Sequence, residues 1–148
     1  MIVVNNLKIE DIIYFAGIVD GEGCIYAQHY KIGNRISATL VVGNTFKQLI
    51  NWIQHHISVG TLSCVDRKDC PNSKPIYIWI CSRPDIEQVL SLILPYLIIK
   101  KKQAIIVLKI RKQMRNRDKS KRNLSNKEIE DRNKWVEEIR LLNKRGRL

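Results

Sequence analysis

The clearest pattern along the chain is an alternation of apolar and more polar positions between residues 36 and 42. A period of two is typical of a strand with one buried face in an antiparallel sheet. Residues 24–31 have a similar pattern, and the turn-like sequence 32–35 joins the two stretches. We therefore expect a hairpin whose buried face carries Ile25, Ala27, Ile36, Ala38, Leu40 and Val42. Its open face would carry Tyr26, Gln28, Tyr30, Ser37 and Thr39.

Helical patterns and a second hairpin surround this first hairpin. Asn6 can cap a helix that begins near Leu7, Thr45 can cap a second helix, and Pro84 suits the first turn of a third. The other expected elements are strands at 60–65 and 76–81 and helices at 46–57, 84–94 and 126–143. One more helix is expected between the last two, ending at about residue 114. The order predicts an α+β fold of two αββ units followed by helices. We expect one domain over 1–148, with its core at about 7–114 and a basic segment and C-terminal helix at 115–148.

The end of the first helix combines apolar residues with two acids. Every residue in 12–19 is apolar or glycine, so one side of the helix can pack on the chain's own core and the other on a second apolar partner. Asp20 and Glu22 then lie where a helix carries partial negative charge, and acids are unfavourable there. If two such helices met at their small residues, the gathered carboxylates would favour a divalent cation such as Mg²⁺. The alternative is a buried helix that ends in an acidic glycine turn.

Composition narrows the class of partner. The 148 residues include 26 Lys and Arg against 14 Asp and Glu, a net charge of +12, which indicates a polyanion such as nucleic acid. A membrane-surface protein would need a basic amphipathic helix, and none is evident. No apolar run is long enough to span a membrane, and no signal peptide is evident, so we expect a soluble intracellular protein.

The four cysteines form no Cys-x-x-Cys pair, which argues against zinc. We expect buried free thiols. A Cys64–Cys81 or Cys64–Cys70 disulfide is the alternative in an extreme thermophile.

A basic run follows the expected core. Residues 109–122 contain eight basic side chains, among them Arg111 and Arg115, and one acid. We expect phosphate contact here, and the alternative is a solvated face or linker. The apolar stripe of the last helix (Ile129, Trp135, Val136, Ile139 and Leu142) is interpreted as packing.

The stretch 15–23, with Ala16, Gly17, Asp20 and Gly23, resembles the signature helix of the LAGLIDADG homing endonucleases. Residues 95–110, with Lys100, and the end helix are also similar to the single-motif, homodimeric branch of that family. The resemblance implies an αββαββα fold with a curved four-stranded antiparallel sheet that binds the DNA major groove. It also implies a homodimer that pairs through the signature helix, at Phe15, Ala16, Gly17, Val19 and Asp20.

The resemblance further implies a site-specific, double-strand DNA endonuclease of intron homing. Glu22, helped by the Gly21 carbonyl, would hold two or three Mg²⁺ ions per dimer. Lys100 would stabilise the transition state or polarise the network of the attacking water. Asp20, the third catalytic candidate beside Glu22 and Lys100, would serve mainly the helix end and the interface, near the metals. The target would be a pseudo-palindrome of about 20 base pairs.

Candidate DNA contacts include the open-face residues of the first hairpin. The others are Asn34, Arg35, Ser63, Arg67, Lys74, Arg111 and Arg115. Each strand residue can instead be a plain exposed residue. On strand 76–81 the resemblance directs Ile76 and Ile78 toward DNA, and the opposite orientation stays open.

Two departures from the family pattern bear on catalysis. Glu22 replaces the commoner Asp, and Phe46 occupies the place of a polar residue that organises water, so that Asn44 or Gln48 would have to take over. The alternative functions are an RNA maturase that binds intron RNA, a DNA-binding protein that has lost cleavage, and a basic protein without site specificity.

Overall fold

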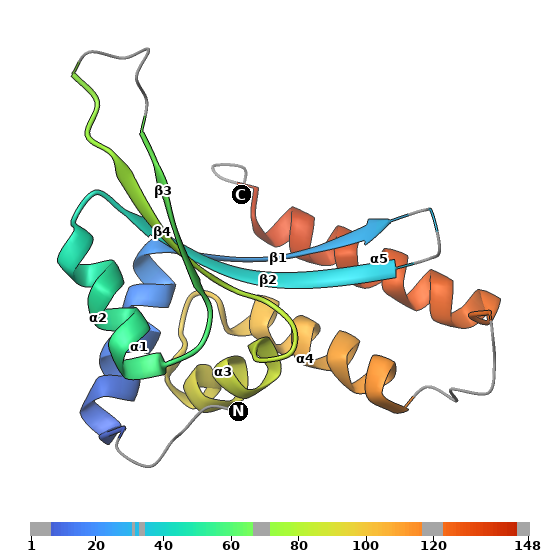
Figure 1. Ribbon diagram of the computed structural model, residues 1–148. Coiled ribbons are helices and arrows are strands. Elements are labelled where there is room, and N and C mark those ends of the chain that lie inside the picture. The colour runs from blue at the N-terminus through green and yellow to red at the C-terminus, as the bar shows by residue number, and fades with distance from the viewer. Residues whose placement is uncertain (1–6, 31, 33–34, 67–71, 117–122, 145–148) are drawn as a thin grey trace.

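A computed structural model gives the fold of the chain for residues 7–30, 32, 35–66, 72–116 and 123–144. The helices and strands follow one another in the order that the sequence predicts, two αββ units and then helices (Figure 1). The helices are α1 (Ile9–Glu22), α2 (Lys47–Ile57), α3 (Ile86–Ile93), the 3₁₀ helix η3 (Leu94–Tyr96), α4 (Lys101–Asn116) and α5 (Asn126–Leu142). The strands are β1 (Gly23–Tyr30), β2 (Arg35–Asn44), β3 (Thr61–Val65) and β4 (Ile76–Cys81).

The four strands form one antiparallel sheet in the order β1-β2-β4-β3. Only the last part of β2, from Leu40 to Asn44, pairs with β4, so the rest of the β1–β2 hairpin extends beyond the second hairpin (Figure 1). Together with the helices this confirms the α+β, αββαββα architecture.

The pleat assigns each strand residue to one of two faces. Ile25, Leu40 and Trp79 are fully buried on the face that the helices cover. Because Trp79 and Cys81 are both fully buried, Ile76 and Ile78 lie on the opposite face. This is the orientation that the family resemblance implies.

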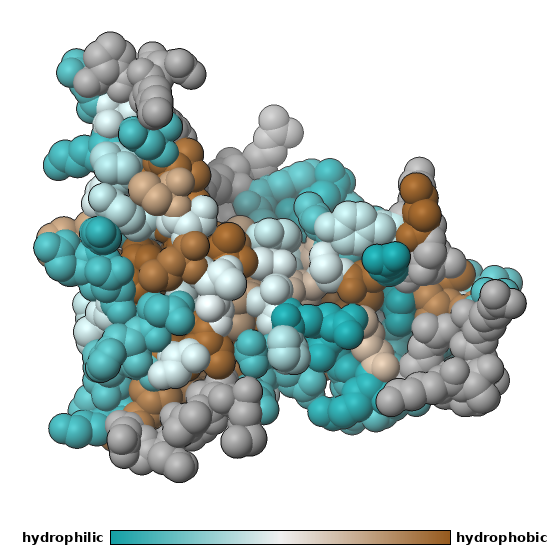
Figure 2. All heavy atoms as spheres, viewed as in Figure 1, coloured by the Kyte–Doolittle hydropathy of each residue, from teal (hydrophilic) through white to brown (hydrophobic). Residues whose placement is uncertain are grey.

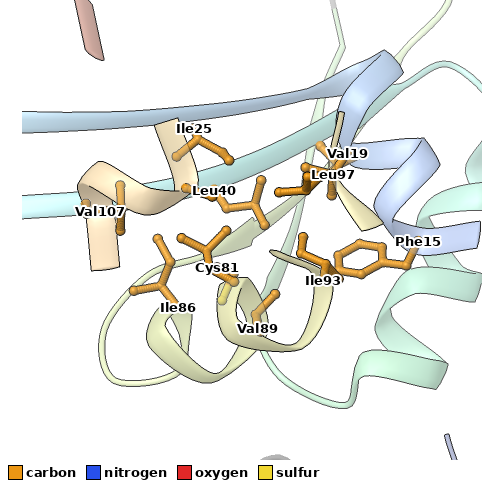
Figure 3. Packing of buried hydrophobic residues seen from close by; sticks show 14 of the residues in the cluster. Phe15, Val19, Ile25, Leu40, Cys81, Ile86, Val89, Ile93, Leu97 and Val107 are labelled. Atoms are coloured by element: carbon orange, nitrogen blue, oxygen red, sulfur yellow. The ribbon is translucent and has the colours of Figure 1, made fainter. Parts of the chain in front are cut away.

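The core lies between the sheet and the helices on its buried face. Figure 3 shows side chains from α1, α3 and α4 meeting those of β1, β2 and β4 in this layer. The ring of Phe15 packs edge-on against Trp79, with their centroids 5.6 Å apart. The indole Nε1 of Trp79 donates to the Val59 carbonyl at 2.9 Å, so the one polar atom of this buried ring is satisfied.

Helix α5 packs along β1, beside the long hairpin (Figure 1). Ser125 and Glu128 form a capping box at its start, and Ile139 of the expected stripe is buried. At its other end the Asn143 amide donates to the Ile25 carbonyl at 2.8 Å. The bond satisfies a carbonyl of β1, which ends the sheet on this side.

Several expected boundaries are wrong in detail. Thr45 does not cap α2, because the cap residue is Phe46 and the Asn44 side chain accepts its N–H at 2.8 Å. Pro84 precedes α3, whose cap residue is Asp85, and follows a cis peptide bond. Helix α1 begins at Ile9, and the expected cap Asn6 lies outside the described residues. The described cysteines Cys24, Cys64 and Cys81 are all free, but only Cys81 is buried as expected, and Cys70 lies outside the described residues.

In the described part of the chain, each helix is too short or too polar to traverse a lipid bilayer.

Candidate nucleic-acid interface and catalytic centre

The open face of the sheet brings together most of the expected base-reading side chains. Strand register places Gln28 opposite Ser37 and Tyr26 opposite Thr39. On the second hairpin Ser63 lies opposite Ile78. The face therefore carries Tyr26, Gln28, Tyr30, Arg35, Ser37, Thr39 and Ser63.

Not every candidate is equally accessible. Thr39 is only 9% exposed, although it belongs to the open face, because it lies on an inner strand beside Tyr26. Lys74 is exposed but precedes β4 instead of lying on it. Asn34 and Arg67 lie outside the described residues.

One hydrogen bond on this face links two candidates. The Tyr30 hydroxyl donates to the Gln28 side-chain oxygen at 2.9 Å. That oxygen is therefore already engaged, while the amide NH₂ group keeps two donors for a ligand. The strand pattern predicts that the two side chains share a face, but it does not show whether they make contact.

A groove of about 700 Å³ lies between the edge of β1 and α5. Tyr26, Gln28 and Tyr30 line one side, and Arg140 and Lys144 line the other. The sequence analysis did not select these two cations, since it interpreted the last helix as packing. Arg140 also forms an ion pair with Glu137 at 2.7 Å. Its hydrogen bond to the Glu137 carboxyl lowers the pKa of that carboxyl.

The C-terminal end of α1 meets the segment before α4 through Asp20. Its carboxylate accepts three successive backbone N–H groups, from Ile98 at 2.7 Å, Ile99 at 3.2 Å and Lys100 at 2.9 Å. Consecutive N–H groups of this kind form a small anion-binding concavity. The Asp20 carboxylate is therefore engaged within the chain, where it holds the segment that precedes α4.

The Lys100 side chain completes this junction. Its Nζ donates to the Asp20 carbonyl at 2.5 Å, where a cation is favoured by the partial negative charge of the helix end. Lys100 is half-buried, so its ammonium group is held at the end of α1 instead of extending into solvent.

Glu22, in contrast, is exposed, and among the described residues its carboxylate has no hydrogen bond or ion pair. It is the last residue of α1 and directly precedes β1. A free carboxylate beside the carbonyls that end a helix is an oxygen donor set that suits Mg²⁺. The described residues contain no group of three or more acids, cysteines or histidines arranged to hold a metal.

The chain passes from α1 into β1 through Gly23. Gly23 ends α1 in an extended conformation, with φ −78° and ψ 155°. It is needed for space, because a Cβ atom here would lie 2.6 Å from the Val19 carbonyl oxygen. The strand can therefore follow the helix directly, with Glu22 as the last residue of α1.

One side of α1 is exposed although it is largely apolar. Ile9, Ile13 and Tyr14 are between 48% and 56% exposed, and a Cβ atom built on Gly17 or Gly21 would meet no atom of the described residues within 4 Å. This apolar side of α1 is therefore not covered by the described residues of the chain.

The exposed side of α1 differs from the expected interface. Phe15, Ala16 and Val19 are fully buried in the core of the chain, so they offer no surface to a second helix. Gly17 is exposed and lies in the middle of the available side. The all-apolar stretch concealed this division, which depends on which side of the helix meets the sheet.

Two arginines expected to bind DNA lie elsewhere. Arg111 and Arg115 belong to α4, which covers the buried face of the sheet, and both approach Glu87 of α3. The Arg115 Nη1 atom lies 2.5 Å from the Glu87 carboxylate, and the Arg111 Nε atom lies 3.8 Å from it, too far for a hydrogen bond. Burial, with help from Arg83, lowers the pKa of Arg111. These side chains do not extend the open face.

At the level of whole-sequence comparison, no protein family and no curated protein matches the chain. Solved structures do match. The homing endonuclease I-CvuI, in complex with a DNA target, aligns over 95% of this chain and 89% of its own, with a TM-score of 0.72 and 23% identity. The archaeal intron-encoded homing endonuclease I-Vdi141I, complexed with DNA, aligns over 93% of this chain and 87% of its own, with a TM-score of 0.71 and 15% identity.

The chain has the LAGLIDADG homing-endonuclease fold. A third protein of this fold, the LAGLIDADG homing endonuclease I-GzeII in complex with its DNA target, aligns over 94% of the present chain but 47% of its own, with a TM-score of 0.69 and 20% identity. The chain therefore corresponds to about half of I-GzeII and to nearly all of I-CvuI. A homing-endonuclease fold of this size is one αββαββα unit.

Proposed function

We propose that the protein is a homodimeric, site-specific DNA endonuclease of the intron-homing type that hydrolyses phosphodiester bonds with Mg²⁺. The observation that carries this proposal is the position of Glu22. This exposed acid has no partner among the described residues and lies at the end of α1, two residues after Asp20, whose carbonyl binds the Lys100 ammonium group. The DNA-bound structures of the same fold support it.

The sheet is suited to a long DNA site. Strand β1 has eight residues, which span about 26 Å at ~3.3 Å per residue. That length covers roughly eight base pairs at ~3.4 Å per pair. Polar side chains at every second position, such as Gln28 and Ser37, provide donors and acceptors for base edges in the major groove.

A second copy of the chain would complete the centre. The exposed side of α1 is apolar and offers close approach at Gly17, where nothing occupies the space that a side chain would fill. Pairing two such sides around a two-fold axis would bring both Glu22 side chains to the middle of the paired sheets. The dimer would then read a pseudo-palindromic site.

The chain's own residues have distinct tasks in this centre. Glu22 and the Gly21 carbonyl would hold Mg²⁺, which when bound would activate water and stabilise the charge on the phosphate. Asp20 is a positioning residue, because its carboxylate holds the segment that carries Lys100. Lys100 would place a positive charge beside the scissile phosphate, where negative charge develops in the transition state.

The test is cleavage of a plasmid that carries the intron-minus host gene, with purified protein and Mg²⁺. Wild-type protein should give linear product. The variant Glu22→Gln should bind the same DNA but leave the plasmid intact. The control Glu138→Gln changes an exposed acid on α5 and should cleave normally. Cleavage by the Glu22→Gln variant would refute the assignment of the metal site.

One observation favours a second candidate, a protein of this fold that binds intron RNA or DNA without cleaving it. Phe46 is 61% exposed where the family pattern has a polar residue, and Asn44 is occupied by the Phe46 N–H. Gln48 is exposed and carries the polar group that this position lacks. An intact plasmid together with stimulated intron splicing would support the maturase and exclude the endonuclease.

A further inference from the structure

Helix α4 differs from the other long helix of the chain in its charge. Its sixteen residues contain six basic side chains and no acid, whereas α5 contains four basic and five acidic side chains in seventeen residues. Surface helices of globular proteins usually mix both signs, as α5 does, so the composition of α4 is unusual for a plain solvated surface.

The buried side of α4 determines where its lysines point. Ala104, Val107 and Ile110 are fully buried against the rest of the core. At 100° per residue the opposite side carries one continuous stripe, which is exposed throughout. The lysine stripe consists of Lys101, Lys102, Ile105, Lys109 and Lys112.

The cations of the stripe are not neutralised. Glu87 of α3 approaches Arg111 and Arg115, which lie beside the stripe on the α3 side. Within the described residues, no ion pair engages Lys101, Lys102, Lys109 or Lys112. Figure 2 shows hydrophilic side chains over the part of the view where α4 lies in Figure 1.

The stripe also faces away from the open face of the sheet. Helix α4 lies on the buried side of the sheet, and Figure 3 shows Val107 of α4 below Ile25 and Leu40. The stripe points farther outward still, so a duplex on the open face cannot reach most of its length. A ligand of the stripe is therefore a separate molecule or a separate segment of the same one.

We propose that the lysine stripe binds the phosphate backbone of a second DNA duplex segment without regard to sequence. From Lys101 to Lys112 the stripe extends about 16 Å at ~1.5 Å per residue, which is roughly half a turn of duplex. It offers ammonium groups and one isoleucine, which attract phosphates but cannot distinguish bases.

The choice of DNA as occupant rests on the proposed function, since a site-specific endonuclease finds its target within an excess of other DNA. A dimer that holds one segment on its sheets and another on α4 can pass between segments of the same molecule. The stripe would then assist the search for the target instead of recognising it.

The experiment uses full-length protein saturated with unlabelled target duplex, to which a labelled duplex of unrelated sequence is added. Wild-type protein should bind the second duplex in a salt-dependent manner. The variant Lys109→Gln/Lys112→Gln should bind it about tenfold more weakly, with a salt slope lower by about 1.8. The matched control, Lys127→Gln/Lys134→Gln on α5, removes the same charge and should bind like the wild type.

Equal binding by the stripe variant and the wild type would overturn the proposal, as would failure of the saturated wild type to bind any second duplex. The same titration is carried out with a labelled RNA duplex of the same length. Binding of the RNA at least tenfold more tightly than the DNA would refute DNA as the occupant. The titration is repeated without target duplex. A protein that binds unrelated DNA through the stripe but shows no target preference would retain this inference while the proposed function fails.

Discussion

Asp20 and Lys100 are joined by two hydrogen bonds that run in the same direction, from Lys100 to Asp20. The Lys100 backbone N–H donates to the Asp20 carboxylate at 2.9 Å, and the Lys100 ammonium group donates to the Asp20 carbonyl at 2.5 Å. The first acid of the motif thus has a structural task within the chain, whereas Glu22 is the acid that we propose as the metal ligand. The two acids should therefore respond differently to substitution.

Loss of the Asp20 carboxylate should destabilise the subunit. Asp20→Ala leaves three N–H groups without their acceptor, and we expect the free energy of unfolding to fall by about 2 kcal/mol. Asp20→Asn keeps one oxygen acceptor, and its free energy of unfolding should fall by about 1 kcal/mol. Urea denaturation gives both values. Glu22→Gln serves as the reference and should stay within about 0.5 kcal/mol of the wild type; a Glu22→Gln variant as unstable as Asp20→Ala would contradict this division of roles.

Two neighbouring glycines should give opposite effects. In Gly23→Ala the new Cβ would lie 2.6 Å from the Val19 carbonyl oxygen, and we expect a loss of about 2 kcal/mol or more. In Gly21→Ala the Cβ meets nothing within 4 Å, and the helix should gain about 0.5 to 1 kcal/mol. Thermal unfolding of both variants, followed by circular dichroism, compares them directly. Similar shifts of Tm in the two variants would contradict the close approach of Gly23 to the Val19 carbonyl.

Gly17 tests the homodimer. Gly17→Leu fills open space on the exposed side of α1, so a single subunit should fold at least as stably as before, with a gain of up to about 1 kcal/mol in helix propensity. A second helix could then no longer approach closely. Sedimentation equilibrium should show dimers for the wild type and monomers for Gly17→Leu, with Gly17→Ala in between. Dimers of the leucine variant would place the interface elsewhere.

The hydrogen bond between Tyr30 and Gln28 should influence base preference. Tyr30→Phe frees the Gln28 oxygen to act as an acceptor. An amide with both a donor and an acceptor free favours adenine, so selection from randomised duplexes should show a shift toward adenine at one position in each half-site. The shift should be roughly tenfold, within the ~1–3 kcal/mol range for a bidentate contact. Gln28→Ala should abolish the preference there, and an unchanged preference in both variants would remove Gln28 from the readers.

Alkaline stability should depend on Cys81. Burial, reinforced by the nearby Asp85 charge, raises the pKa of its thiol to about 12. An unfolded thiol ionises near pH 9, so between these values the unfolded state releases the proton first and stability falls as the pH rises. The fall approaches about 1.4 kcal/mol per pH unit. Urea denaturation between pH 9 and 11 should show a shallower decline in Cys81→Ala, and identical slopes would contradict the shift.

Local sequence was sufficient for most of the sheet. Alternation over residues 36–42 assigned Ile36 and Leu40 to the buried face and Ser37 to the open face, because the period of two is set by the backbone itself. The motif likewise placed Glu22 at the end of α1, since the helix runs directly into β1. The orientation of strand β4 was less clear, because almost all its residues are apolar and alternation cannot distinguish its two faces. The full burial of Trp79 decides its orientation.

The sequence by itself determined which residues form the elements, which side of the first hairpin is polar and where the acids of the motif fall. Tertiary structure alone decided what those residues touch. Asp20 meets Lys100 across a separation of 80 residues, α1 turns Phe15 inward and Gly17 outward, and Glu87 takes up the arginines of α4 but not its lysines. The physical reason is that periodicity depends only on neighbouring residues, whereas contacts depend on how separate elements pack.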